Sequence, residues 1–294
     1  MSLLTKTTVI ITNDWDNMTS LHQKIAEART LLFVPGNRPE RFQKALDSKP
    51  DMIVLDLEDA VGVGDKDVAR HNITAWLDAG GPGLIRINDV ETPWFESDMR
   101  MLEGRECGLM VPKVTCPEQI TEVLARMSAA ACALPLLEVA AGILEARRIC
   151  AAPGVVRAVF GNADLGRELG VDHADRSAMY HARCEVVLAS VAAGIASPID
   201  GVTTAVHDHD LVFADAEHAA RIGFTRKLCL HPRQVKLVEE AFAPSEEDVR
   251  WARAVLGVSS DGSGTALRGE VVGKPIVDRA RRLLRYARDV ETGA

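Results

Sequence analysis

The stretch LPLLEVAAGILEARRICAAPGVVRAVFGNAD, residues 134–164, is the part of the sequence that most directly indicates the fold. An apolar run at 134–138 leads into residues 142–150, where apolar side chains recur every three or four positions, and a second apolar run follows at 155–160. Continuous apolar runs are typical of parallel strands covered by helices, and a spacing of three to four residues is typical of a helix. The stretch therefore predicts a strand–helix–strand unit.

This unit recurs along the chain. Six further apolar runs complete a set of eight strand candidates: 30–34, 52–57, 83–87, 108–112, 198–202 and 226–230. Helical patterns occupy the intervals between them, at 39–46, 65–79, 117–131, 175–194 and 208–222. Eight strand–helix repeats without a long break in composition predict a TIM (β/α)8 barrel. An open, doubly wound sheet is the alternative, because the number of strands alone does not prove that the sheet closes.

The pattern divides the chain into three regions: an N-terminal extension at 1–28, the barrel at 29–243, and C-terminal helices with a lid or arm at 244–294. The last region contains a Gly/Ser-rich stretch, residues 257–273, between helical patterns at 245–256 and 277–290. We interpret this stretch as a lid or as an arm exchanged between subunits, and a disordered linker is the alternative.

Composition argues against several classes of protein. Apolar residues make up 47% of the 294 residues and charged residues 26%, which is the balance of a soluble globular protein. The net charge of −8 argues against a nucleic-acid partner, and no apolar run reaches the roughly 20 residues of a membrane span. The six cysteines form no CxxC pair. We therefore expect a cytoplasmic protein without disulfides and without a nucleic-acid or membrane partner.

Acidic residues follow two neighbouring strand candidates. Glu138 ends the fifth predicted strand, and Asp164 follows the sixth within the sequence GNAD. In a TIM barrel the active site lies at the carboxyl ends of the strands, so these two carboxylates would share one rim. A carboxylate pair suits a hard divalent cation, because Mg2+ prefers one or two carboxylates with water or substrate oxygens in its other positions. We predict a Mg2+ site at Glu138 and Asp164, with Mn2+ as the alternative ion.

Other charged residues end neighbouring strands on the same rim. Arg86 offers the planar guanidinium fork that binds a carboxylate at two points. Glu58 and Asp59 could position water or transfer protons, although we expect one of the two to be structural. Lys113 raises a competing interpretation, since a lysine on a barrel strand can form a Schiff base, as in class I aldolases. We favour a lysine that neutralises the carboxylates, because the acidic pair already supplies an electron sink.

A pair of histidines and the absence of common motifs bear on other functions. His207 and His209 have the spacing that places two imidazoles on one side of an extended segment, as a zinc site would need. No third ligand stands at a recognisable spacing, so a solvated loop is the favoured interpretation. The chain has no G-x-S-x-G, Walker-type or G-x-G-x-x-G sequence, which argues against hydrolase, nucleotidase and Rossmann functions.

Seven segments carry a resemblance to a known family. They are LFVPGNRPERFQKAL (32–46), DMIVLDLEDAV (51–61), IRINDVETPWFESD (85–98), MVPKV (110–114), LPLLEVAAGILEARRI (134–149), VFGNADLGRELGV (159–171) and GFTRKLCLHPRQVKLVEEAFAPSEEDVRWAR (223–253). Together they resemble the citrate lyase β-subunit-like family of the HpcH/HpaI aldolase superfamily, over residues 29 to 287 or so. Each motif alone is weak, whereas seven in the same order are specific.

The resemblance implies a trimeric or hexameric barrel that binds Mg2+ and acts on acyl-CoA thioesters. By motif match, Glu138 and Asp164 would be the metal ligands, and Arg86 would hold the carboxylate of the oxo acid. Glu58 and Asp59, in LDLED, would support these groups. The residues implied to face the CoA phosphates or pantetheine are Arg29, Asn37, Arg38, Arg41 and Lys66.

Asp278, in GKPIVD, matches an aspartate that a neighbouring subunit inserts into the site in the CoA lyases of this superfamily. The resemblance implies that it donates a proton to the departing carbon. Related chains commonly continue this motif with a proline, whereas Arg279 and Ala280 follow here, which weakens the match. A second departure is LLEVAAG, where the family usually has Ile and Thr around the glutamate. This change affects the lining and leaves the metal ligand in place.

These features predict a carbon–carbon lyase that cleaves a short 3-hydroxy-3-carboxyacyl-CoA. The favoured substrate is (S)-citramalyl-CoA, which would give pyruvate and acetyl-CoA. The alternatives are a malyl-CoA or methylmalyl-CoA lyase, a citryl thioester lyase subunit, and a malate synthase or thioesterase. A non-catalytic scaffold is the least favoured, because Glu138, Asp164 and Arg86 are all retained. The sequence decides neither the acyl group nor whether CoA or an acyl-carrier protein carries it.

Overall fold

A closed barrel of eight parallel strands forms the centre of the computed structural model, which describes residues 21–259, 266–267, 270–271 and 273–292. The strands are β1 (Thr30–Pro35), β2 (Met52–Asp56), β3 (Leu84–Arg86), β4 (Gly108–Val111), β5 (Cys132–Leu137), β6 (Arg157–Phe160), β7 (Ala196–Asp200) and β8 (Arg226–Cys229). Each strand pairs with the next, and β8 returns to β1 through the pairing of Lys227 with Thr30. This closure confirms the predicted TIM barrel and excludes the open sheet.

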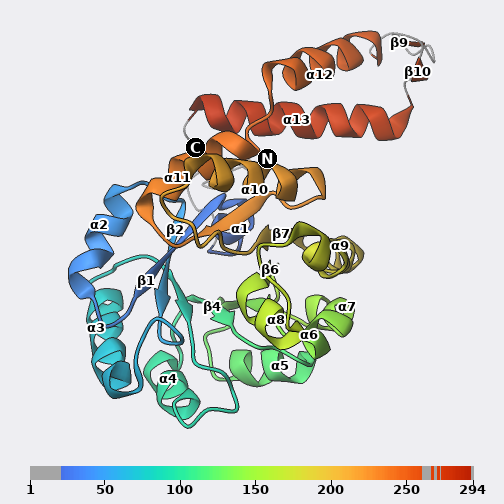
Figure 1. The fold of residues 1–294 in the computed structure, drawn as a ribbon. Helices are drawn as coiled ribbons and strands as arrows, with labels where there is room; N and C mark the ends of the chain where they lie inside the picture. Colours follow the sequence, from blue (N-terminus) through green and yellow to red (C-terminus); the bar gives the residue numbers. More distant parts are fainter. Residues whose placement is uncertain (1–20, 260–265, 268–269, 272, 293–294) are drawn as a thin grey trace, which may run out of the picture.

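Helices follow the strands and cover the barrel (Figure 1). They are α1 (Leu21–Glu27), α2 (Phe42–Asp47), α3 (Lys66–Asp78), α4 (Phe95–Leu102), α5 (Pro117–Ala125), α6 (Ala140–Leu144), α7 (Ala146–Cys150), α8 (Asn162–Leu169), α9 (Arg176–Ala193), α10 (His209–Arg221) and α11 (Pro232–Phe242), with short 3-10 turns η2 (Pro39–Arg41) and η3 (Val63–Asp65). The helix expected at 142–150 is two short helices, α6 and α7. The chain leaves the helical conformation at Glu145, whose ψ is 4°.

Strand residues alternate between two apolar layers. Side chains such as Val54, Leu84 and Leu136 point into the barrel, whereas their neighbours pack under the helices. Ile25 of α1 is 1% exposed and joins the inner layer, so α1 packs against the amino-terminal end of the barrel. Every second side chain of a strand points to the same side. The inward-pointing residues that come two positions after these inner residues therefore line the carboxyl-terminal end of the barrel, which we call the mouth.

The C-terminal region forms an arm. Helices α12 (Glu246–Ser259) and α13 (Lys274–Thr292) pack on each other around Ala252, Val255 and Ala280, and the pair extends away from the barrel (Figure 1). Between them the structure describes a two-stranded ribbon, β9 (Ala266–Leu267) with β10 (Glu270–Val271). The rest of the Gly/Ser-rich stretch lies outside the described residues, so the choice between lid and linker stays a prediction.

All six cysteines are free thiols in the structure, and four of them are buried. Within the described ranges, no helix is both long enough and apolar enough to span a membrane.

Candidate active site

An ion pair at the ends of β2 and β3 forms the base of the carboxyl-terminal mouth. Asp56 and Arg86 lie two residues beyond the inner positions Val54 and Leu84 and are register partners. Arg86 Nε and Nη2 donate hydrogen bonds to the two carboxylate oxygens of Asp56, both at 2.7 Å. Burial opposes the charge, but the Asp56 and Glu58 carboxylates raise the pKa of Arg86, so the guanidinium stays charged. Phe33 covers one face of it, with its ring centroid at 4.7 Å.

Glu58 lies beside this pair and carries an oxygen without a hydrogen-bond donor. Its side chain forms an ion pair with the ammonium of Lys113, and its Oε2 lies 2.9 Å from Arg86 Nη1. No donor among the described residues makes a hydrogen bond to Oε2. Burial and the neighbouring Asp59 raise the pKa of Glu58, although Arg86 and Lys113 oppose this shift. Asp59 differs from Glu58, because its side chain is 59% exposed and lies 3.9 Å from Arg86.

Glu138 and Asp164 meet on the other side of the mouth. Glu138 follows β5 at an inward position and is 3% exposed, and Asp164 lies in the first turn of α8 with its side chain 15% exposed. Burial raises the pKa of Glu138 well above its ordinary value, and the charges of Glu58 and Asp164 raise it further. A Cβ on Gly161 would lie 2.7 Å from Glu138 Oε2, so the absence of a side chain there makes room for the carboxylate.

This carboxylate pair fits the metal that we predicted. A cation beside Glu138 and Asp164 would stabilise the buried Glu138 carboxylate as an anion, because positive charge offsets the burial that raises its pKa. No group of three or more His, Cys, Asp or Glu side chains suited to a metal occurs in the described part of the chain. Glu138 and Asp164 would supply two ligands and leave the other positions for water and substrate oxygens, as Mg2+ prefers. The same finding gives no support to a zinc site at His207 and His209.

Lys113 does not have the properties of a Schiff-base lysine. Its ammonium is paired with Glu58, and its backbone N–H donates to Glu138 Oε1 at 3.1 Å. Burial tends to lower the pKa of Lys113, but the charges of Glu58 and Glu138 raise it overall. A protonated amine is not a nucleophile, so the structure supports the neutralising role that we favoured.

Lys66 occupies a different place from the one expected of a CoA contact. It is 5% exposed, and its Nζ donates to the carbonyls of Leu57 (2.6 Å) and Glu58 (2.8 Å) and to Asn88 Oδ1 (2.7 Å). Asn88 in turn donates to Asp98, which is fully buried. These three acceptors use the three donors of the ammonium. Lys66 therefore stabilises the loop that carries Glu58, and its ammonium has no donor left for the CoA phosphates.

The loop after β1 carries three of the other residues expected to face CoA. Asn37 donates to Asp65 at 2.8 Å, and Arg38 pairs with Glu40 at 2.7 Å. Arg41 lies near the same glutamate, and the side chains of Arg38 and Arg41 are about half exposed (49% and 52%). Because this loop follows a strand, it lies on the same face of the barrel as the carboxylates.

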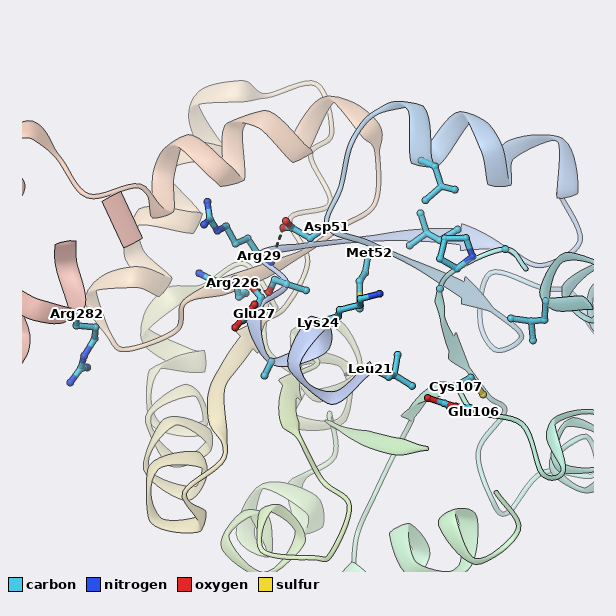
Figure 2. A pocket seen from close by; sticks show the side chains of 18 residues that line it. Leu21, Lys24, Glu27, Arg29, Asp51, Met52, Glu106, Cys107, Arg226 and Arg282 are labelled. Atoms are coloured by element: carbon cyan, nitrogen blue, oxygen red, sulfur yellow. Dashed lines mark hydrogen bonds between the residues drawn. The ribbon is translucent and has the colours of Figure 1, made fainter. Parts of the chain in front are cut away.

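Arg29 lies at the opposite end of the barrel. It precedes β1, its backbone N–H donates to Asp51, and it lines a cavity of about 780 Å3 with Arg226 and Arg282 (Figure 2). Six strand residues at about 3.3 Å each separate Arg29 from the mouth by roughly 20 Å. Arg29 is therefore not beside the mouth of its own subunit, contrary to the expectation of a CoA contact there.

Asp278 lies on the arm. It belongs to α13, pairs with Arg281 of the same helix at 3.5 Å, and has a half-exposed side chain. No contact among the described residues places Asp278 at the mouth of its own chain. This position agrees with the expectation that such an aspartate would serve a neighbouring subunit, which stays a prediction.

Three residues that hold the site together were given no role from the sequence. Asp56 holds Arg86, Asn88 connects Lys66 to Asp98, and Asp98 accepts from both the backbone and the side chain of Asn88. A signal was available for Asp56, because it ends one apolar strand and Arg86 ends the next, and the two are register partners.

Comparison with known proteins defines the family. The HpcH/HpaI aldolase/citrate lyase family model matches residues 29–232. This chain belongs to that family. It is 36% identical over 275 residues to the citrate lyase subunit beta-like protein of Deinococcus radiodurans, covering 88% of this chain and 96% of the relative. Members of the family are carbon–carbon lyases, and the prediction that this chain is such an enzyme is confirmed.

Other relatives differ in what they act on. The chain is 29% identical over 301 residues to the mitochondrial citramalyl-CoA lyase of Rattus norvegicus (92% and 89% covered), and 30% identical over 273 residues to a (3S)-malyl-CoA thioesterase of Cereibacter sphaeroides (88% and 94%). It is similar to the crystal structure of CitE from Mycobacterium tuberculosis in complex with magnesium, acetoacetate and coenzyme A. That similarity has a TM-score of 0.79 at 32% identity, covering 89% of this chain and 99% of the other.

Proposed function

We propose that this enzyme is a Mg2+-dependent lyase that cleaves (S)-citramalyl-CoA to pyruvate and acetyl-CoA in the cytoplasm. The observation that carries the proposal is the arrangement of the mouth, where the carboxylate pair of Glu138 and Asp164 lies with the charged guanidinium of Arg86. This set offers a cation site and a carboxylate site together, which are the two features needed to hold a 2-oxo acid.

Each end of the substrate has a matching group. Asp56 occupies the Nε–Nη2 edge of Arg86, and Glu58 Oε2 lies 2.9 Å from Nη1. The Nη protons that point away from these two carboxylates are the donors for the carboxylate of the oxo acid. The exposed guanidinium groups of Arg38 and Arg41 on the loop after β1 are suited to the CoA phosphates. Asn37 of the same loop would contact the CoA moiety.

The reaction breaks the bond between the hydroxyl-bearing carbon and the carbon next to the thioester. The hydroxyl loses its proton and becomes the ketone of the oxo acid, and the other carbon keeps the electron pair and gains a proton to give acetyl-CoA. Glu138 and Asp164 would hold Mg2+, which supplies positive charge that lowers the pKa of the substrate hydroxyl. Glu58 Oε2 is a buried oxygen without a donor among the described residues, and we assign it as the proton acceptor.

The protonation of the departing carbon is assigned to Asp278 of a neighbouring subunit in a homotrimer or hexamer. Two features support this assignment: the arm extends away from its own barrel, and Asp278 is half exposed on it (Figure 1). Asp59, which is also exposed, would orient water at the mouth.

A substrate panel tests the proposal. The purified protein is incubated with citramalyl-, malyl-, methylmalyl- and citryl-CoA, with Mg2+ or with EDTA, and acetyl-CoA, free CoA and the oxo acid are measured. We expect Mg2+-dependent release of pyruvate and acetyl-CoA from citramalyl-CoA in equal amounts. Free CoA without an oxo acid would instead show a thioesterase, and no turnover of any thioester would contradict the lyase assignment.

A further inference from the structure

Lys113 has a backbone conformation that is unusual for a residue with a side chain. It follows β4 with φ of 51°, in the left-handed region that favours glycine. Among the described residues, the only other non-glycine residue with positive φ is Lys49, at 57° on the surface. Such conformations persist where the surrounding structure enforces them, and they concentrate at functional sites.

The surroundings of Lys113 enforce this conformation. The carbonyl oxygen of Val114 lies so close to α6 that a Cβ on Gly142 would approach it to 2.2 Å, so the chain after β4 is packed against the helix that follows Glu138. In this conformation the Lys113 N–H reaches Glu138 Oε1 at 3.1 Å. Its ammonium extends in another direction, to Glu58. One residue thus contacts two carboxylates through two different groups.

We propose that Lys113 is a positioning residue with two separable roles in this site. Its backbone N–H orients Glu138 for the cation, and its ammonium shares the charge of Glu58 with Arg86, so that Arg86 keeps positive charge to attract the oxo acid. The inference rests on the proposed function, because it assumes that Glu138 binds a cation and that Arg86 binds a carboxylate.

The two roles predict effects of opposite sign. The ammonium is a positive charge near Glu138, so its removal leaves the cation site more negative and favours Mg2+. Arg86 and Lys113 share the charge of the buried Glu58, since Arg86 Nη1 already lies 2.9 Å from Glu58 Oε2. Without the ammonium, Arg86 is the only ion-pair partner left to Glu58 among the described residues, and it attracts a substrate carboxylate less. A residue that merely stabilised the fold would weaken both ligands together.

Substitutions at Lys113 separate the roles. Lys113→Gly removes the ammonium but keeps the N–H and adopts positive φ without strain. Its Kd for Mg2+, measured by calorimetry, should equal the wild-type value or be lower, whereas its Kd for pyruvate in saturating Mg2+ should rise roughly tenfold or more, the effect of one charge in a half-buried site. Lys113→Ala should bind Mg2+ more weakly than Lys113→Gly, because its Cβ disfavours the conformation that directs the N–H to Glu138.

Lys49 provides the matched control. Lys49→Gly and Lys49→Ala make the same backbone change on the surface, and both should bind Mg2+ and pyruvate like the wild type. The inference is overturned if Lys113→Gly binds pyruvate like the wild type, or if it weakens Mg2+ and pyruvate equally. A wild-type protein that binds neither ligand would overturn the proposed function and this inference with it, so the two failures are distinguishable.

Discussion

Replacing Asp56 with asparagine removes the fully buried charge of the Asp56–Arg86 ion pair while changing the side-chain volume very little. The Asp56 carboxylate accepts four hydrogen bonds: from Arg86 Nε and Nη2, from the backbone of Glu58 at 2.9 Å and from the backbone of Ala60 at 3.0 Å. An asparagine has one acceptor oxygen, and its NH2 group would face donors. Arg86 would also keep its charge without its main partner.

The expected cost follows from these contacts. Breaking a buried ion pair by changing one partner costs about 3–5 kcal/mol, because the other charge stays buried. The free energy of unfolding, measured by urea denaturation at one protein concentration, should fall by that amount in Asp56→Asn. Combining it with Arg86→Met should cost less than the sum of the two single substitutions, since the residues are in direct contact.

Asp67 provides a control for this experiment. Its carboxylate also pairs with an arginine, Arg70, but its side chain is 95% exposed. Exposed pairs contribute about 0–1 kcal/mol, so Asp67→Asn should change the free energy of unfolding by no more than that. A cost below about 1 kcal/mol for Asp56→Asn, or additive effects in the double variant, would refute the assigned role of the pair.

Three further predictions concern the same mouth. Burial opposes ionisation of Asp56, but Arg86 lowers its pKa below the ordinary 3.8. The stability from this pair is therefore present above pH 3.8 and is lost as the pH falls through the lowered pKa. In acid titrations, the difference in free energy of unfolding between the wild type and Asp56→Asn should shrink over that acidic range. Gly161→Ala should weaken Mg2+ binding about tenfold or more in calorimetry, because its Cβ would displace the carboxylate of Glu138, whereas Gly62→Ala, with open space around it, should not. Lys66→Met should lower the melting temperature and kcat, because three buried acceptors lose their donor, and unchanged values would contradict its supporting role.

The fold could be predicted because its signals are local. The eight short apolar runs that predicted strands correspond to the eight strands of the barrel. Closure of the barrel was harder to predict, because it depends on the pairing of β1 with β8. Thr30 and Lys227 pair although about 200 residues separate them, and no local pattern encodes that contact. The helix at 142–150 is divided at Glu145, where the backbone turns although the apolar spacing continues.

The sequence predicted those site residues whose place in the structure depends on their position along a strand. Glu138 and Arg86 end strands at inward positions, and the structure brings them to one mouth together with Asp164. Lys66 could not be assigned correctly, because whether a lysine points inward or outward depends on acceptors that only the folded chain assembles. Arg29 could have been placed, since a residue that precedes a strand lies at the end of the barrel opposite the site.

The most direct test of the account is the affinity of Mg2+ for the protein and for variants of its two proposed ligands. Calorimetric titration of Mg2+ should give one site per chain in the wild type, and Glu138→Gln and Asp164→Asn should each weaken it about 100-fold or more, because each removes a charged ligand. Glu246→Gln, at a residue with a 94% exposed side chain on the arm, should bind Mg2+ like the wild type. Wild-type affinity in both ligand variants would contradict the assignment of the site.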